Sequence, residues 1–329
     1  MSFYGAEKEF IFHLWLKTRK DRLEQALGIR LGGILFERKE EGQKPIDMYA
    51  LDGVLGRPVL VESQLGRSDP PHFAVVRELI HSLGEGTIVY QALSFQDKHI
   101  REFRNLVETS GKPIRLYLVI INQDVLNPLT ELDRLNKLDV YHNLWRMDKV
   151  SNVLQVVKTV EHPSFRALQP QQIPNESNDL SSRINVNKFL IEELRGNIPE
   201  FLPFHREKTL YPQNPVIYFG AGASGLTYHC SVRDSRGFAF VDLRFSEDRN
   251  YLFHLFAMKP NLLKALIDKR VYVGHDRIGV QFRTSPDVRA NVRQVVKIFR
   301  VMIEHISRPL YDILDFEYEV MAMRKRRTA

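Results

Sequence analysis

The chain has 329 residues, 43% of them hydrophobic and 26% charged, which is the composition of an ordinary globular protein with room for two domains. Its single cysteine, Cys230, excludes an internal disulfide and a zinc site made of several cysteines. The longest apolar run, Ile114–Ile121, is too short to cross a bilayer and no secretory signal is evident, so we expect a cytoplasmic protein without a membrane partner. The net charge of +7 suits a polyanionic partner, but it is a weak indication, because many basic proteins bind nothing negative.

The first half of the chain predicts a mixed α/β sheet covered by helices. Apolar side chains at helical spacing predict a helix over Ala6–Leu27, which Gly28 ends. The pattern then predicts strands at Gly32–Arg38, Pro45–Leu51 and Arg57–Gln64, a helix with Pro near its start and Gly84 just past its end, a strand Thr87–Leu93, a helix Gln96–Gly111, a strand Pro113–Ile121, a partly helical segment Leu126–Lys149 and a strand Ser151–Val160.

The second half predicts an α+β unit with an antiparallel sheet. Its expected elements are a helix near Val186–Arg195, strands Gly225–Arg233 and Gly237–Phe245, a helix Arg249–Ile267 with a break expected at Pro260, short strands within Arg270–Gly274 and Ile278–Arg283, and a long helix Pro286–His305. Between the halves, the polar stretch Ala167–Arg183 has no periodicity. It predicts a linker at 166–184 between domains at 1–165 and 185–329.

One glycine-rich motif imitates a nucleotide site. The sequence GAGASG, with Gly220, Gly222 and Gly225, matches the spacing of a dinucleotide-binding loop. Such a loop needs a helix after it, so that the pyrophosphate meets the helix N-terminus. Here the residues from Leu226 to Arg233 alternate between apolar and polar, which predicts a strand. The glycine-rich segment before it is therefore interpreted as a turn.

Acidic side chains converge in the hairpin predicted between the second and third strands. Residues alternate along a strand, so Glu62 and Gln64 share a face while Ser63 points away. The turn Asp52–Gly56 sets a register in which paired residue numbers sum to about 109, and this puts Asp47 opposite Glu62 with Cβ atoms about 5 Å apart. Two such carboxylates repel unless a cation joins them or one stays protonated, and their oxygens suit Mg²⁺ or Mn²⁺. The pattern alone equally fits an exposed strand end with solvated acids.

These residues resemble the motif of the PD-(D/E)xK nuclease superfamily: Asp47, about fifteen residues, then Glu62-x-Gln64 at the end of an apolar strand. The closer likeness is to a bacterial branch in which Gln replaces the last Lys. Members of that branch have a Glu-Asn-Gln-like triplet, then Arg-Thr-Asp and a helix that begins with His, and the corresponding segment of this chain is VESQLGRSDPPHF. The likeness covers about Ala6–Ile121, and the second half only in outline. It implies a restriction-endonuclease-like core that cleaves DNA with Mg²⁺ or Mn²⁺, in bacterial defence or mobile-element biology.

Carried over residue by residue, the resemblance implies Asp47 and Glu62 as metal ligands, with the Ser63 carbonyl as a third. It places Gln64 where most members have a catalytic Lys, and it implies a further carboxylate from the first helix, either Glu9 or Glu7. An amide can only orient water or a phosphate oxygen. Activation of water would then fall to the metal, or the site would be weakened or inactive.

Three further residues follow this motif as supporting candidates. Arg67 could contact a phosphate, and His72 would lie near the cleft. Asp69 is the expected N-cap of the next helix.

The long helix of the second half has one basic face. Arg289, Arg293, Lys297 and Arg300 form a stripe opposite Val288, Val292, Val295, Phe299 and Met302. A solvated helix face explains this stripe, and so does a surface that follows a nucleic-acid backbone. The basic tail Met323–Ala329 equally fits a disordered end or a phosphate contact.

The leading hypothesis is therefore a metal-dependent DNA endonuclease, with RNA also open as a substrate. Its C-terminal domain would bind the substrate, a partner protein or a second copy of the chain. The rival hypothesis is a nuclease-fold protein without catalysis that binds DNA or serves in an assembly, and Gln64 is the residue that supports it.

Overall fold

The chain forms two compact units in the computed structural model, which describes residues 8–38, 46–171, 179–198 and 212–317. Of the described residues, the N-terminal unit comprises 8–38, 46–135 and 142–171, and the C-terminal unit comprises 136–141, 179–198 and 212–317. The sequence did not predict that 136–141 belongs to the C-terminal unit. Leu138 is buried in the core of that unit, and Asn136 Nδ2 donates a hydrogen bond to Asp315 Oδ2 at 2.8 Å.

The stretch predicted as a linker begins as part of the N-terminal unit. The Gln171 backbone N–H donates to the Leu55 carbonyl at 2.9 Å, and the Arg57 guanidinium donates to the Gln169 carbonyl at 3.4 Å. The N-terminal unit therefore extends into this stretch. Its contacts there join residues that are far apart in the sequence, so polar composition alone does not reveal them.

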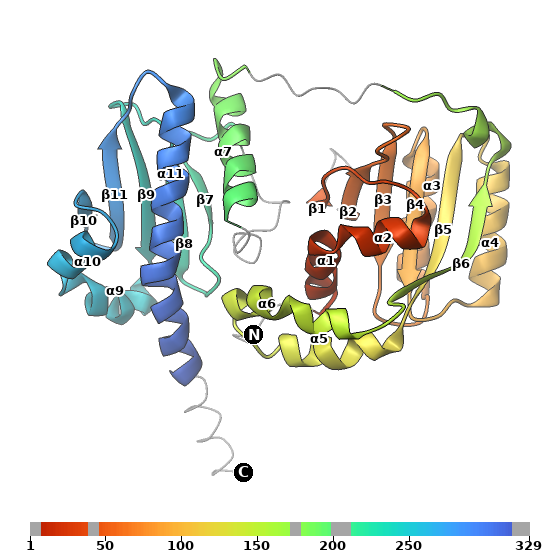
Figure 1. Ribbon diagram of the computed structural model, residues 1–329, viewed down its shortest axis with the longest axis horizontal. Helices are drawn as coiled ribbons and strands as arrows, with labels where there is room; N and C mark the ends of the chain where they lie inside the picture. Colours follow the sequence, from red (N-terminus) through yellow and green to blue (C-terminus); the bar gives the residue numbers. More distant parts are fainter. Residues whose placement is uncertain (1–7, 39–45, 172–178, 199–211, 318–329) are drawn as a thin grey trace, which may run out of the picture. The chain divides into compact units, whose positions relative to one another are not determined.

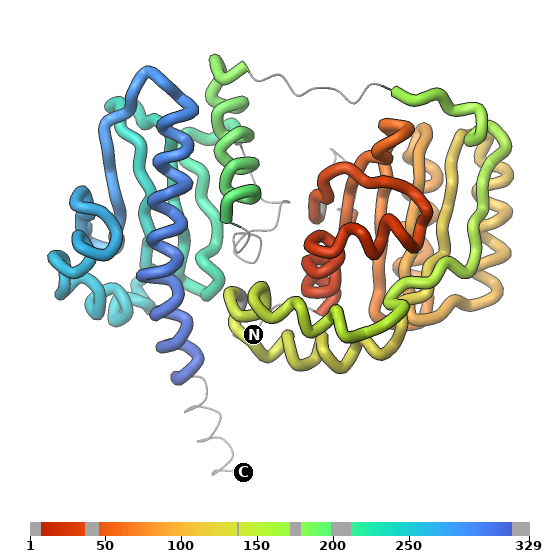
Figure 2. Tube along the Cα trace, viewed as in Figure 1, coloured from red at the N-terminus to blue at the C-terminus, as the bar shows by residue number. Residues whose placement is uncertain are grey.

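The N-terminal unit is a six-stranded mixed sheet flanked by helices (Figures 1 and 2). Its strands are β1 (Leu35–Arg38), β2 (Ile46–Leu51), β3 (Pro58–Ser63), β4 (Gly86–Ala92), β5 (Ile114–Ile121) and β6 (Leu154–Glu161). Its α-helices are α1 (Lys8–Thr18), α2 (Lys20–Leu27), α3 (Pro70–Ser82), α4 (Asp97–Thr109) and α5 (Leu126–Leu132), and α6 (Lys137–Asn143) follows across the boundary of the units. Short 3-10 helices occupy Gln123–Val125, Leu144–Lys149 and Pro163–Ala167.

The strands pair in chain order, β1-β2-β3-β4-β5-β6. Strands β3, β4 and β5 are parallel to one another, whereas β1, β2 and β6 pair antiparallel. Every residue of β4 is buried, as expected for a parallel strand covered on both faces. Helices α3 and α4 pack on one face through Val76, Ile80 and Phe103, and Figure 1 shows α1 and α2 on the other. The mixed α/β class predicted for this half is confirmed.

The opening helix differs from its prediction, because it is two helices. Gly28 ends α2 in the left-handed conformation at φ 67°, as expected, but Arg19 interrupts the helical backbone at φ −116° and ψ 50°. The Arg19 guanidinium binds the Asp148 carboxylate, which also accepts from Trp15 Nε1 at 3.0 Å. A partner more than a hundred residues away in sequence thus lies at the break.

The C-terminal unit is a five-stranded antiparallel sheet with helices, in the order β10-β11-β9-β8-β7. Its strands are β7 (Ile217–Gly220), β8 (Leu226–Ser231), β9 (Phe238–Phe245), β10 (Val271–Val273) and β11 (Arg277–Arg283). Its α-helices are α7 (Arg183–Asn197), α9 (Asn250–Ala257), α10 (Pro260–Leu266) and α11 (Val288–Met302), and a π-helical turn (Ile303–Ser307) continues α11. The predicted helix break at Pro260 and the strand after GAGASG are both confirmed.

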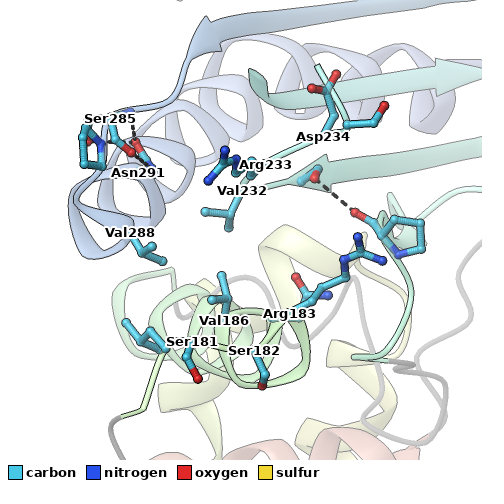
Figure 3. A pocket seen from close by; sticks show the side chains of 16 residues that line it. Ser181, Ser182, Arg183, Val186, Val232, Arg233, Asp234, Ser285, Val288 and Asn291 are labelled. Carbon is cyan, nitrogen blue, oxygen red and sulfur yellow. Dashed lines mark hydrogen bonds between the residues drawn. The ribbon is translucent and has the colours of Figure 1, made fainter. Parts of the chain in front are cut away.

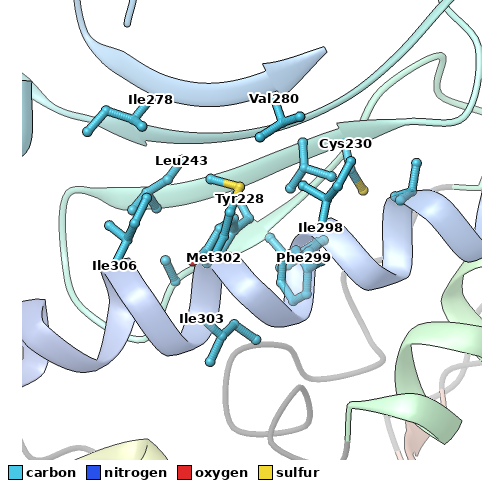
Figure 4. Packing of buried hydrophobic residues seen from close by; sticks show 14 of the residues in the cluster. Tyr228, Cys230, Leu243, Ile278, Val280, Ile298, Phe299, Met302, Ile303 and Ile306 are labelled. Carbon is cyan, nitrogen blue, oxygen red and sulfur yellow. The ribbon is translucent and has the colours of Figure 1, made fainter. Parts of the chain in front are cut away.

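One face of this sheet packs against α11. Tyr228, Cys230 and Leu243 point from the strands toward Phe299 and Met302 of the helix (Figure 4). These side chains are at most 1% exposed, so the alternate residues of each strand face the other way.

Candidate functional site

The predicted register of the β2–β3 hairpin is confirmed. The pairs run from Met48 opposite Val61 to Leu51 opposite Pro58, and their residue numbers sum to 109. Continued by one residue, this register sets Asp47 opposite Glu62. The Asp47 carboxylate accepts a hydrogen bond from the Ser63 backbone N–H at 2.8 Å, so it touches the peptide unit that joins Glu62 to Ser63.

The two acids differ in their environments. Glu62 is buried, whereas the Asp47 side chain is 29% exposed. His13 of α1 is also buried, and its Nε2 lies 3.8 Å from Asp47 Oδ2. The sequence analysis did not predict His13 as a residue of this site. The signal that could have found it is a histidine inside the otherwise apolar, fully buried run Phe10–Leu16.

The first helix brings a further carboxylate to the end of β3. Glu9 Oε1 accepts a hydrogen bond from the Leu65 backbone N–H at 3.0 Å, one residue beyond Gln64. The alternative residue, Glu7, lies outside the described residues. Glu9 thus lies beside the chain segment that carries the motif.

Gln64 is buried, and the nitrogen and the oxygen of its amide both make hydrogen bonds to other residues. Its Oε1 accepts from the Tyr90 hydroxyl, and its Nε2 donates to the Arg67 carbonyl at 2.7 Å and to Asp69 Oδ2 at 3.4 Å. Burial raises the pKa of the Tyr90 hydroxyl, and the charges of Asp69 and Glu62 raise it further. The hydroxyl therefore stays a donor. Both N–H donors of the amide are therefore used, and Oε1 keeps one lone pair with which it could accept a hydrogen bond from water.

The residues after the motif hold the start of α3. Asp69 is its N-cap, as predicted, because its carboxylate accepts from the His72 backbone N–H at 3.0 Å. Asp69 Oδ1 also lies 2.8 Å from His72 Nδ1. Burial pushes the pKa of Asp69 up, but the hydrogen bonds from His72 and Gln64 outweigh burial and leave that pKa below its ordinary value. The Arg67 side chain is exposed, and its carbonyl is what contacts Gln64.

The donors at the hairpin suit a hard cation. Mg²⁺ binds through one or two carboxylates plus water or phosphate oxygens, and Asp47, Glu62 and the Ser63 carbonyl offer ligands of that kind. In the part of the chain that the structure describes, no group of three or more His, Cys, Asp or Glu side chains is arranged to hold a metal ion. A metal here would therefore depend on the two acids and on substrate oxygens.

The basic stripe of α11 divides into two pairs. The Arg289 guanidinium lies over the Phe189 ring of α7 at 4.9 Å, and the Arg300 guanidinium donates to the Asn197 carbonyl at the end of α7. Arg293 and Lys297 are exposed. Opposite the stripe, the predicted apolar face is buried in the core. Two of the four basic side chains thus fix α7 against α11.

The C-terminal unit also has a cavity of about 420 Å³ between the start of α7 and the end of β8 (Figure 3). Its walls include the exposed Arg183 and Arg233. Much of the other polar lining is already bonded to protein: Ser182 caps α7, Asn291 Nδ2 donates to the Ser285 carbonyl, and Ser231 donates to the Pro215 carbonyl. The cavity therefore offers a ligand few free polar groups besides the two arginines.

Comparison with known proteins identifies no relative. No family model matches the chain, no curated protein resembles it significantly, and no solved structure does. Within the described residues, no helix is long and apolar enough to pass through a membrane.

Proposed function

We propose that the N-terminal unit is a metal-dependent phosphodiesterase that cleaves DNA in the cytoplasm. The observation that carries the proposal is the hairpin, whose register sets Asp47 opposite Glu62 and whose Asp47 carboxylate contacts the peptide next to Glu62. Placing two carboxylates together costs free energy unless a cation offsets their repulsion.

Each residue of the hairpin would have a distinct role. Asp47 and Glu62, with the Ser63 carbonyl, would hold Mg²⁺ or Mn²⁺. The bound ion would lower the pKa of water and stabilise negative charge on the phosphate. His13 Nε2 lies 3.8 Å from Asp47 Oδ2 and would help to orient that carboxylate. Glu9 is held by the Leu65 N–H and would add negative potential at the same strand end.

A second candidate function is a nuclease-fold module that binds nucleic acid without cleaving it. The specific observation in its favour is Gln64, whose Nε2 and Oε1 both already bind protein groups, at Arg67, Asp69 and Tyr90. In this case the amide is a structural bridge between β3, β4 and the start of α3.

A cleavage assay distinguishes the two functions. Wild type would be incubated with supercoiled plasmid, linear duplex and single-stranded DNA or RNA, in Mg²⁺, in Mn²⁺ and in EDTA. We expect cleavage that requires the metal and is lost in Glu62→Ala and in Asp47→Asn. The control is Glu78→Ala, because Glu78 is an exposed acid of α3 away from the hairpin.

Metal binding gives a second readout that does not depend on activity. Titration with Mn²⁺ should show one site in wild type and in Glu78→Ala, and none in Asp47→Asn. A wild type that is inert on every substrate with both metals, and that binds no Mn²⁺, would remove the enzyme proposal.

A further inference from the structure

One row of paired residues crosses all five strands of the C-terminal sheet. The register pairs Tyr218 of β7 with His229 of β8, His229 with Asp242 of β9, Asp242 with Gly279 of β11, and Gly279 with Tyr272 of β10. Directly paired residues lie on the same face of a sheet. All five positions therefore belong to one face.

This face is the one turned away from α11. The sequence neighbours of the row, including Tyr228, Leu243 and Ile278, are buried against the helix (Figure 4). Because successive side chains alternate, the row points to the opposite side. There Tyr218 is 52% exposed, so the described residues leave the end of the row open to solvent.

A buried carboxylate organises the middle of this face. Asp242 is 2% exposed and accepts a hydrogen bond from the Tyr272 hydroxyl. Gly279 makes room for it, because a Cβ at that position would lie 2.2 Å from Asp242 Oδ1. Arg244 and Arg277 approach the same carboxylate at 4.0 and 3.9 Å. The carboxylate thus holds two guanidinium groups in place.

The two arginines keep their hydrogen-bonding capacity. They are paired with each other across β9 and β11, next to the row, and their side chains are 34% and 39% exposed. Within the described residues they make ion-pair contacts only at 3.9 Å or more, to Asp242 and to Asp276, and no hydrogen bond. A guanidinium carries five N–H donors, and although the Nε of each arginine is buried, the four donors on its Nη atoms can still bind a phosphate.

Aromatic rings accompany the arginines. The Tyr218 ring stacks on the His229 ring, with centroids 5.7 Å apart and an interplanar angle of 28°. Burial and the nearby Arg244 and Arg277 lower the pKa of His229 to about 4, so this ring is neutral at pH 7. On the same face, the Arg283 guanidinium lies 5.9 Å from the Phe238 ring.

We propose that this sheet face binds single-stranded nucleic acid. Unpaired bases would stack on the exposed Tyr218 ring, and Arg244 and Arg277 would take the phosphates. Proteins that bind single strands combine such aromatic platforms with basic grooves. Arginines outnumber acids here and favour a polyanion: the arginines are Arg244, Arg277 and Arg283, and the acids beside them are Asp242 and Asp276. A duplex keeps its bases stacked inside, so it could use only the arginines.

The test is binding of fluorescent 20-nucleotide strands, measured by anisotropy in EDTA, where a metal-dependent nuclease does not cut. The probes are single-stranded DNA, single-stranded RNA and a DNA duplex. We expect both single strands to bind more tightly than the duplex. Tyr218→Ala should weaken single-strand binding by about 5- to 150-fold, which is the loss of one stacked base.

Arg277→Gln should weaken the binding of all three probes. It should also make the slope of log affinity against log salt less steep, by about the amount that one phosphate contact contributes. Two controls should bind as wild type does. Trp145→Ala removes an aromatic that is also 52% exposed but belongs to the N-terminal unit, and Lys188→Gln removes an exposed cation of α7, the helix that packs on α11. Thermal melting would check that each variant is folded.

The outcomes separate this inference from the cleavage proposal. Folded Tyr218→Ala and Arg277→Gln variants with wild-type affinity would overturn the sheet-face inference, even if plasmid cleavage persists. Equal affinity for single strands and duplex, without any effect of Tyr218→Ala, would also overturn it, because binding would then use phosphates alone. Single-strand binding that Tyr218→Ala weakens, in a protein that cuts nothing and binds no Mn²⁺, would support the sheet-face inference and remove the nuclease proposal.

Discussion

Gln64 offers the sharpest test of the N-terminal site, because its amide is either a structural bridge or a catalytic group. Gln64→Ala removes the acceptor of the Tyr90 hydroxyl, and Tyr90 is fully buried. A buried donor left without a partner costs about 1–3 kcal/mol of unfolding free energy. Gln64→Lys should cost a similar amount, since an ammonium group can donate to the Arg67 carbonyl but cannot accept from Tyr90.

The assay is urea denaturation followed by tryptophan fluorescence. Both tryptophans, Trp15 and Trp145, belong to the N-terminal unit, so the signal reports that unit alone. A double-mutant cycle of Gln64→Ala with Tyr90→Phe should show a coupling of about 0.5–3 kcal/mol, because Tyr90→Phe removes the donor that the first change leaves unpaired.

Cleavage by the same variants then separates the two roles. If the amide also positions water, Gln64→Ala slows cleavage by roughly 10²-fold while Mn²⁺ still binds. The structural argument is refuted if Gln64→Ala unfolds at the wild-type urea concentration and its coupling with Tyr90→Phe is close to zero.

Three further predictions concern single positions. Asp69→Ala should cost about 0.5–2 kcal/mol of unfolding free energy by removing the cap of α3. Because the folded pKa of Asp69 lies below its ordinary value of 3.8, this loss should be complete above that pH and should shrink as the pH falls through the folded pKa. An equal loss at pH 7 and pH 2 in urea denaturation would contradict this. Gly279→Ala should cost about 1–3 kcal/mol by crowding Asp242, and a variant with wild-type thermal stability would show that the carboxylate moves freely. Cys230 is buried and its thiol pKa is raised to about 12, by burial first and by Asp242 second, so a thiol reagent should label it only after unfolding, whereas full labelling of the native protein would contradict its burial.

The local features of the site were predictable because short-range rules set them. A tight turn fixes the register of a hairpin, and the Asp52–Gly56 turn led to the observed pairing of Met48 with Val61. The cap of α3 followed from Asp69 and the prolines after it. In the same way, alternation after GAGASG identified a strand and ruled out the helix that a dinucleotide loop requires.

Other parts of the site depend on partners that no local pattern specifies. Tyr90 reaches Gln64 from a neighbouring parallel strand, and His13 reaches Asp47 from α1. The number of residues between such partners says nothing about whether they meet. The break at Arg19 has the same origin, because its partner Asp148 comes from a different part of the unit.

The amino-acid sequence by itself determined the mixed α/β class, the succession of helices and strands along the first half of the chain, and the hairpin that sets Asp47 opposite Glu62. Only the tertiary structure decided that Gln64 binds Tyr90 and Asp69 through its amide and that one row from Tyr218 to Tyr272 crosses five strands. The physical reason is that alternation within a strand fixes which side chains share a face. Three of the four registers in this row belong to hairpins of consecutive strands, but the register of β9 with β11 joins strands that α9, α10 and β10 separate in the sequence, so no local turn specifies it.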